Sequence, residues 1–181
     1  MTAPTARRPP EVALRVVSPD DVPALTALAV ANRGFLAPFE PERDDSFFTE
    51  ETQLRAVEGA LEKHATGLCV PLVVLAGGEV VGRLTVADVV RGAFESAHLG
   101  YWVSEHVGGR GVATAAVAQA LDLAFGELAL HRVQASTLPD NARSQAVLAR
   151  NGFERIGYAP QYLRIAGRWQ DHVLFQRLAD G

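Results

Sequence analysis

The order of elements expected from this sequence predicts an α/β (α+β) fold, with a mixed sheet of about seven strands and helices on both faces. Two hairpin signals support it: Gly77-Gly78 joins two apolar runs, and Ala166-Gly167-Arg168 joins two more near the end of the chain. Between the hairpins, strand-like and helix-like segments alternate, which indicates crossover connections. The sequence shows no internal repeat and no linker to a second domain.

The expected elements follow one another from residue 11 onward. Residues 1–10 contain three prolines and two arginines and are expected to form a disordered tail, which leaves 11–181 as a single domain. Strands are expected at 12–17, 71–76, 79–87, 97–103, 132–138, 153–165 and 169–178. Helices are expected at 20–31, 49–64, 111–128 and 139–151, and residues 32–48, rich in proline and aromatic side chains, are expected to form a loop.

Composition limits the classes of function. The net charge is −4, which argues against a nucleic-acid-binding protein, although several arginines cluster locally. No apolar run is long enough for a transmembrane helix, and the first residues do not form a signal peptide. The single cysteine, Cys69, cannot form an internal disulfide and is expected to be a buried, inert thiol. A cytoplasmic protein without membrane contact is therefore expected.

The segment Gly108-Gly109-Arg110-Gly111 lies between an apolar strand and a helix rich in small residues, an arrangement typical of phosphate binding. A Walker A loop would require a lysine that is absent here. A Rossmann fingerprint would require a third small residue, where Thr114 stands, and an acidic residue on the next strand. A simple glycine turn that starts a helix remains the alternative reading of this segment alone.

Three segments together carry a family resemblance. LGYWVSEHVGGRGVAT (99–114) looks like an acetyl-CoA signature strand and loop, and DNARSQAVLARNGF (140–153) looks like the helix that follows it in the same family. NRGFLAPFEP (32–41) is similar to a substrate segment. On these segments, residues 14–178 resemble the GNAT acyl-CoA N-acyltransferases, in particular their ribosomal-protein alanine N-acetyltransferase (RimJ/RimL) type.

The resemblance implies a mostly antiparallel sheet that splays between its fourth and fifth strands. It also implies acetyl-CoA as co-substrate, no metal, and direct attack of a primary amine on the thioester. The acceptor would be a protein N-terminus, as in a ribosomal protein, or a small molecule such as an aminoglycoside or an amino-acid derivative. A catalytically silent acyl-CoA-binding module is the alternative from another class, and a homodimer is left open.

The same resemblance assigns a cofactor site. Backbone groups of the glycine loop would hold the pyrophosphate, and those of the preceding strand the pantetheine arm. The family usually has Gln or Arg where Gly108 stands, so the backbone must contribute more here. The residues expected to bind acetyl-CoA are Trp102, Val103, Gly108, Gly109, Arg110, Gly111, Val112, Ala113, Thr114, Asn141 and Ser144.

Acetyl transfer requires a neutral amine and a proton for the leaving thiolate. About a tenth of an α-amine is neutral at pH 7, so a weak base suffices. His98 and Glu95, on the strand before the loop, are the candidate bases. Leu148 stands where many GNAT enzymes carry a tyrosine acid, so Ser144 is expected to hydrogen-bond the thiolate.

Aromatic side chains of the segment 32–48 are expected to line the acceptor site. Phe35, Phe39 and Phe47 are the candidate substrate-binding residues, with core packing beneath a long loop as the alternative. Acidic side chains of this segment, including Glu40, could attract a cationic amine, although a solvated loop is the expected reading.

Overall fold

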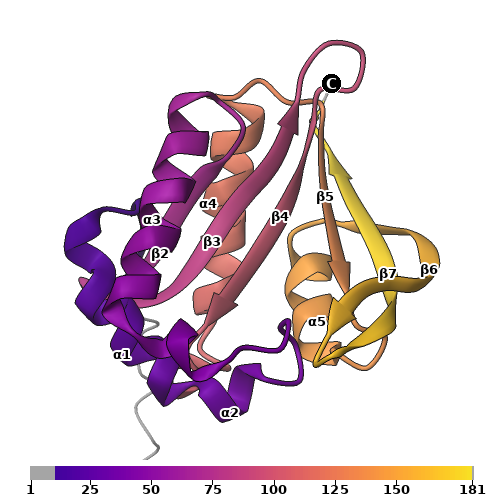
Figure 1. Cartoon of the computed structure of the whole chain (residues 1–181). Helices are drawn as coiled ribbons and strands as arrows, with labels where there is room; N and C mark the ends of the chain where they lie inside the picture. The colour runs from indigo at the N-terminus through magenta and orange to yellow at the C-terminus, as the bar shows by residue number, and fades with distance from the viewer. Residues whose placement is uncertain (1–10, 181) are drawn as a thin grey trace, which may run out of the picture.

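The computed structural model describes residues 11–180, in which the strands form a seven-stranded sheet of order β1-β2-β3-β4-β5-β7-β6 (Figure 1). Neighbouring strands are antiparallel, except for β4 and β5, which are parallel. The predicted mixed, mostly antiparallel sheet is confirmed. The strands are β1 (Val12–Val16), β2 (Val70–Ala76), β3 (Glu79–Val90), β4 (Ser96–Val103), β5 (Arg132–Thr137), β6 (Glu154–Ile165) and β7 (Arg168–Leu178).

Helices cover both faces of the sheet, as predicted. On β2, Leu72 and Val74 belong to the core that packs against α4, whereas Val73 belongs to a second core with α1 and α3. This alternation follows from the two-residue period of a strand. The α-helices are α1 (Val22–Ala31), α2 (Arg33–Leu36), α3 (Glu50–Ala65), α4 (Val112–Phe125) and α5 (Ala142–Arg150), with short 3₁₀ turns η1 (Pro19–Asp21), η2 (Asp45–Phe48) and η3 (Glu105–Val107).

Residues 32–48 are not the plain loop that the sequence predicts. Asn32 ends α1, and the chain then forms the one-turn helix α2, in which Ala37 N–H donates to the Arg33 carbonyl. Asp44 accepts a hydrogen bond from Ser46 N at 3.0 Å and so starts η2. The helix α4 is also shorter than predicted and ends at Phe125, just before Gly126. Single helical turns between prolines have too few residues for a periodic signal.

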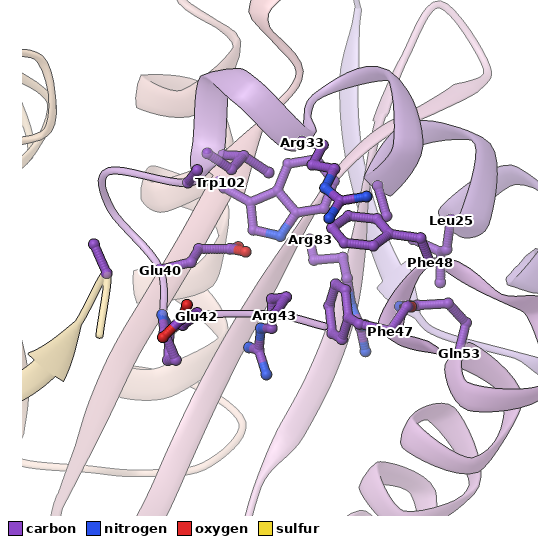
Figure 2. A pocket seen from close by; sticks show the side chains of 15 residues that line it. Leu25, Arg33, Glu40, Glu42, Arg43, Phe47, Phe48, Gln53, Arg83 and Trp102 are labelled. Carbon is purple, nitrogen blue, oxygen red and sulfur yellow. The ribbon is translucent and has the colours of Figure 1, made fainter. Parts of the chain in front are cut away.

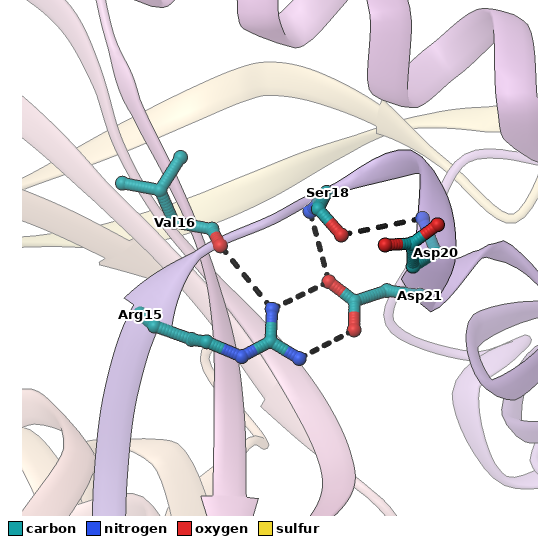
Figure 3. A network of polar contacts seen from close by, with 5 residues as sticks. All are labelled: Arg15, Val16, Ser18, Asp20 and Asp21. Carbon is teal, nitrogen blue, oxygen red and sulfur yellow. Dashed lines mark hydrogen bonds and ion pairs between the residues drawn. The ribbon is translucent and has the colours of Figure 1, made fainter.

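A polar network joins β1 to the turn that starts α1 (Figure 3). The Arg15 guanidinium donates to both oxygens of the Asp21 carboxylate, at 2.7 and 2.6 Å. Asp21 is buried and also accepts a hydrogen bond from Ser18 N at 2.8 Å. The hydrogen bond with Arg15 is the main cause that lowers the pKa of Asp21.

The strands β3 and β4 approach closely at Gly82. A Cβ atom placed there would lie 2.2 Å from the Trp102 carbonyl oxygen, so only glycine allows this contact. The two hairpin turns use left-handed backbone, with positive φ at Gly77 and Gly78 and again at Ala166 and Gly167. Both predicted hairpins are therefore present.

The predicted tail at 1–10 lies outside the described residues. Within 11–180, no helix combines the length and the apolar character needed to cross a membrane. In the same range, no cluster of three or more His, Cys, Asp or Glu side chains suitable for a metal ion is found.

Candidate active site

The strands β4 and β5 separate after a short pairing. They pair only at Ser96–Arg132, Ala97–Val133 and His98–Gln134. Beyond His98, β4 pairs with β3 alone, and β5 pairs with β7 alone. Figure 1 shows the two strands diverging toward the end of the sheet near α2 and α5. The predicted splay is thus confirmed, and the backbone of residues 99–103 has no strand beside it on the β5 side.

A central cavity of about 570 Å³ occupies the space between the diverging strands. Residues 99–102 of β4 and 135–138 at the end of β5 line its two sides, and Asn141 and Ser144 line it from α5. The Thr137 hydroxyl also lies there, buried and without a hydrogen-bond partner among the residues of the structure.

An outer cavity of about 340 Å³ lies beside the central one (Figure 2). Side chains of α1, α2, η2 and the segment 40–43 line it. The two cavities share the side chains of Glu40, Arg43, Phe47, Arg83 and Trp102. These five residues therefore form a junction, where a ligand in the outer cavity could contact a ligand in the central one.

Charged groups meet at this junction. Burial raises the pKa of Glu40, although the nearby Arg43 and Arg83 guanidinium groups oppose the shift. Burial likewise lowers the pKa of Arg83, which the Glu40 carboxylate opposes. Arg43 packs over the Phe47 ring, with its guanidinium carbon 4.3 Å from the ring centre. The junction thus holds a partly buried acid and a partly buried cation, Glu40 and Arg83, beside the more exposed Arg43.

Tyr101 of β4 lies against Ser144 of α5 in the wall of the central cavity. The Tyr101 hydroxyl is 2.9 Å from the Ser144 Oγ and 3.3 Å from the Ser144 carbonyl oxygen. Burial raises the pKa of Tyr101 to about 12, so its hydroxyl keeps its proton at neutral pH. When Tyr101 donates to Ser144 Oγ, the Ser144 hydrogen is free to point into the cavity.

The glycine segment lies directly before α4. Gly109 and Gly111 have φ of +72° and +78°, and Gly111 is the residue that caps the helix. The first N–H groups of α4 have no helical partner, so they can receive an anion. Gly108 is explained by η3: its N–H donates to the Glu105 carbonyl, and a Cβ at Gly108 would lie 3.0 Å from that oxygen.

Two asparagines fix the segments around the cavities. Asn141 caps α5 by accepting a hydrogen bond from Ser144 N at 3.1 Å, which places Ser144 in the first turn. Asn32 is buried at the end of α1, and its Oδ1 accepts from Glu105 N at 2.9 Å. Asn32 also lies within hydrogen-bond distance of Ser104 Oγ, so the end of α1 is attached to the end of β4.

The candidate bases lie elsewhere. Neither His98 nor Glu95 lines either cavity. His98 Nδ1 is 3.7 Å from the Asp88 carboxylate, and Glu95 precedes β4 with a left-handed backbone and contacts Arg91. Glu95 therefore lies just outside the strand on which the sequence placed it.

The aromatic candidates divide between the two cavities. Phe39 lines the central cavity and Phe47 lines both, whereas Phe35 lines neither. Phe48 lines the outer cavity. Gln53 is buried and donates to the Phe47 carbonyl at 2.8 Å, which fixes Phe47 in place.

Sequence reasoning missed three residues of the site. Tyr101, Arg83 and His172 were not among the candidate residues. His172 is buried on β7 and lines the central cavity, with Nδ1 3.0 Å from the Gln170 carbonyl. Because a carbonyl only accepts, this contact assigns the hydrogen to Nδ1 and leaves the Nε2 lone pair free in the neutral ring. The polar alternation of Arg83 and Thr85 within an apolar strand was the available signal.

An acyltransferase architecture is indicated by three features together: the splayed sheet, the glycine turn before α4, and the polar residues Asn141 and Ser144 at the start of α5. The family model described as acetyltransferase (GNAT) domain matches residues 11–154. The chain therefore belongs to the GNAT family, and it is an N-acetyltransferase of that family.

Within this family, the chain is similar to enzymes that act on ribosomal proteins. It is 35% identical to the [ribosomal protein uS5]-alanine N-acetyltransferase of Escherichia coli, over 89% of this chain and 84% of the relative. Among solved structures, RimJ of Mycobacterium smegmatis in complex with CoA-disulfide aligns with a TM-score of 0.91 at 37% identity, covering 93% of this chain and 82% of that one. The ribosomal-protein-S5-alanine acetyltransferase of Vibrio fischeri aligns with a TM-score of 0.88 at 32% identity and covers 93% of both chains.

Proposed function

We propose that this protein transfers the acetyl group of acetyl-CoA to the N-terminal α-amine of a protein. The observation that carries the proposal is the junction of the two cavities: it connects Ser144 and Tyr101, between the diverging strands, to a separate chamber that contains an acid and aromatic walls. The names of the similar enzymes, which include an alanine N-acetyltransferase and a RimJ bound to CoA-disulfide, support the same reaction.

The chain's own groups fit acetyl-CoA. The free N–H groups at the start of α4, from Val112 to Thr114, and the left-handed glycines before them suit a pyrophosphate. The edge of β4 beside Trp102 and Val103 has no strand on its β5 side and suits the amide groups of a pantetheine arm. The Asn141 side chain offers a further polar contact in the central cavity.

The transfer then needs few protein groups. The neutral amine enters from the outer cavity and attacks the thioester carbonyl carbon, so a C–N bond forms and the C–S bond breaks. Ser144 donates its hydroxyl proton toward the leaving thiolate while Tyr101 donates to Ser144 Oγ. The attacking nitrogen must lose a proton as the C–N bond forms, and this proton passes to a base or to water. An α-amine, with a pKa of about 7.7–8.0, demands less of that base than a lysine side chain.

His98 and Glu95 are not supported as that base by their positions outside the cavities. His172 presents a free lone pair at Nε2 and lines the central cavity, so it takes their place in the proposal. Asp171, its neighbour, points instead to Tyr158, with 2.6 Å between the two oxygens.

The test is CoA release with alanine- and serine-terminated peptides, beside a panel of aminoglycosides and amino-acid derivatives. Turnover of the peptides with acetylation at the α-amine, measured by mass spectrometry, is the expected result. Turnover restricted to the small molecules would replace the acceptor in this proposal. Acetyl-CoA binding without turnover of any amine would indicate the silent module instead.

A further inference from the structure

Glu40 and Arg83 form an incomplete charge pair at the cavity junction. Glu40 lies on the segment after α2 and Arg83 on β3, and both line both cavities. Figure 2 shows the Glu40 side chain pointing toward the middle of the outer cavity, where Trp102 and Arg83 also lie. Among residues 11–180, neither charged group makes a hydrogen bond or a close ion pair. Partly buried charges without direct partners are costly, so a ligand with complementary ends would stabilise this site.

The backbone holds Glu40 in this place. Its carbonyl accepts a hydrogen bond from Ala166 N at 2.9 Å, which anchors the segment to the β6–β7 turn. Arg83 is held by the central sheet, because its backbone on β3 pairs with Trp102 of β4. The backbones that carry the two charges are therefore anchored separately, on different sides of the junction.

The N-terminal residue of a protein carries its amino group and its first carbonyl on one carbon atom. A lysine side chain has no carbonyl next to its amine. We infer that Glu40 and Arg83 together recognise this pair, with the Glu40 carboxylate accepting from the amino group and Arg83 donating to the first carbonyl oxygen. The inference rests on the proposed function, because it concerns the acceptor of that reaction.

Apolar side chains surround the charged pair. Phe47 and Trp102 supply apolar walls at the junction, and Phe48 adds one in the outer cavity. Arg43 is partly engaged by the Phe47 ring, which leaves Arg83 as the guanidinium on the sheet side. Tyr101 and Ser144 lie in the same central cavity, so an amine held by Glu40 faces the reacting end of that cavity.

The test compares two acceptors with the same amine-bearing carbon and methyl group, of which only one carries a carbonyl group on that carbon. An alanine-terminated tripeptide amide carries the first carbonyl, whereas isopropylamine replaces it with a methyl group. Both are assayed at pH 9 by CoA release, and kcat/KM is compared between variants. The difference in amine basicity cancels because every variant meets the same two acceptors.

Arg83→Gln is expected to lower kcat/KM for the peptide by about 10- to 100-fold, the usual effect of losing a charged hydrogen bond, and to leave isopropylamine within about threefold. Glu40→Gln is expected to lower kcat/KM for both acceptors, since both carry the amine. Arg83→Lys keeps the charge and should restore part of the peptide activity. Glu51→Gln and Arg55→Gln, which change an exposed pair 3.0 Å apart on α3, should change neither.

If Arg83→Gln lowers kcat/KM equally for both acceptors, or for neither, the inference is overturned while the proposed function stays intact. Loss of CoA binding in the same variant would mark a folding defect, and the Arg83→Lys ratio would then decide the question. A wild-type protein that acetylates neither acceptor would overturn the proposed function, and the inference with it.

Discussion

The Tyr101 hydroxyl lies 2.9 Å from the Ser144 Oγ, and this contact joins β4 to the first turn of α5. The central cavity opens where β4 separates from β5, the strand that leads into α5, so the contact reaches across that opening. A tyrosine thus reaches the serine from the strand, whereas the helical position at which many GNAT enzymes carry one is occupied here by the buried Leu148.

Removal of the Tyr101 hydroxyl should slow the reaction without unfolding the protein. Tyr101→Phe is expected to lower kcat by about 5- to 30-fold, because Ser144 loses the donor that orients its own hydrogen. Ser144→Ala should lower kcat at least as much, and the double variant should be no slower than Ser144→Ala alone. Steady-state CoA release measures all three, with Tyr158→Phe on the exposed edge strand as the matched control. Additive losses would show that the two hydroxyls act separately.

A side chain at Gly100 should block the site and spare the fold. A Cβ atom at Gly100 meets no other atom within 4 Å, and the residue lines the central cavity. Gly100→Val is therefore expected to abolish acetylation while the Tm changes by no more than about 2 °C. Gly82→Ala is the contrasting variant, since its Cβ would collide with the Trp102 carbonyl, and it should cost about 1–3 kcal/mol. Full activity of Gly100→Val would place the reaction outside this cavity.

The left-handed glycine before α4 should be required for coenzyme binding. Gly111→Ala forces a φ of +78° on a residue with a Cβ, at a cost of about 1–2 kcal/mol, and tilts the first N–H groups of α4. Calorimetric titration with CoA is expected to show at least about tenfold weaker binding. Gly59→Ala on α3, where a Cβ meets nothing within 4 Å, should bind CoA normally and gain a little stability. Unchanged affinity in Gly111→Ala would contradict an anion site there.

Asp21 should make stability depend on pH in the acidic range. The hydrogen bond with Arg15 lowers its pKa in the folded protein, so the unfolded chain binds the proton more readily. Its contribution is present above the unfolded pKa of about 3.9 and is lost as the pH falls through the lower, folded value. Urea unfolding at pH 7 should show Asp21→Asn about 1–3 kcal/mol less stable than the wild type, with a smaller deficit at pH 3. Asp20→Asn, which changes an exposed neighbour, should be as stable as the wild type at both pH values. If Asp21→Asn lost equal stability at pH 7 and pH 3, the ionisation of Asp21 would not be the cause.

Local signals predicted most of the fold. Gly77-Gly78 marks a turn that few other pairs can form, and the glycines before α4 and the Asn141 cap mark their helices equally well. The short helix α2 was missed because four residues leave no periodic pattern. The site was harder: Tyr101 and Ser144 are 43 residues apart, as are Glu40 and Arg83, so their meeting depends on strand pairing that no local pattern encodes. The candidate bases illustrate this limit, since His98 and Glu95 were chosen for their place on the strand before the loop, and neither lines a cavity.

The hydrogen bond between Ala166 N and the Glu40 carbonyl joins two segments far apart in the sequence, so it can form only late in synthesis. The ribosome makes the segment that carries Glu40 long before the β6–β7 turn that anchors it. Until that last hairpin has emerged and β7 has inserted between β5 and β6, the Glu40 carbonyl lacks its partner and the segment after α2 lacks its support. The nascent chain thus holds the residues of its reactive chamber for most of translation without the chamber itself, and catalytic competence arises only with the final strands.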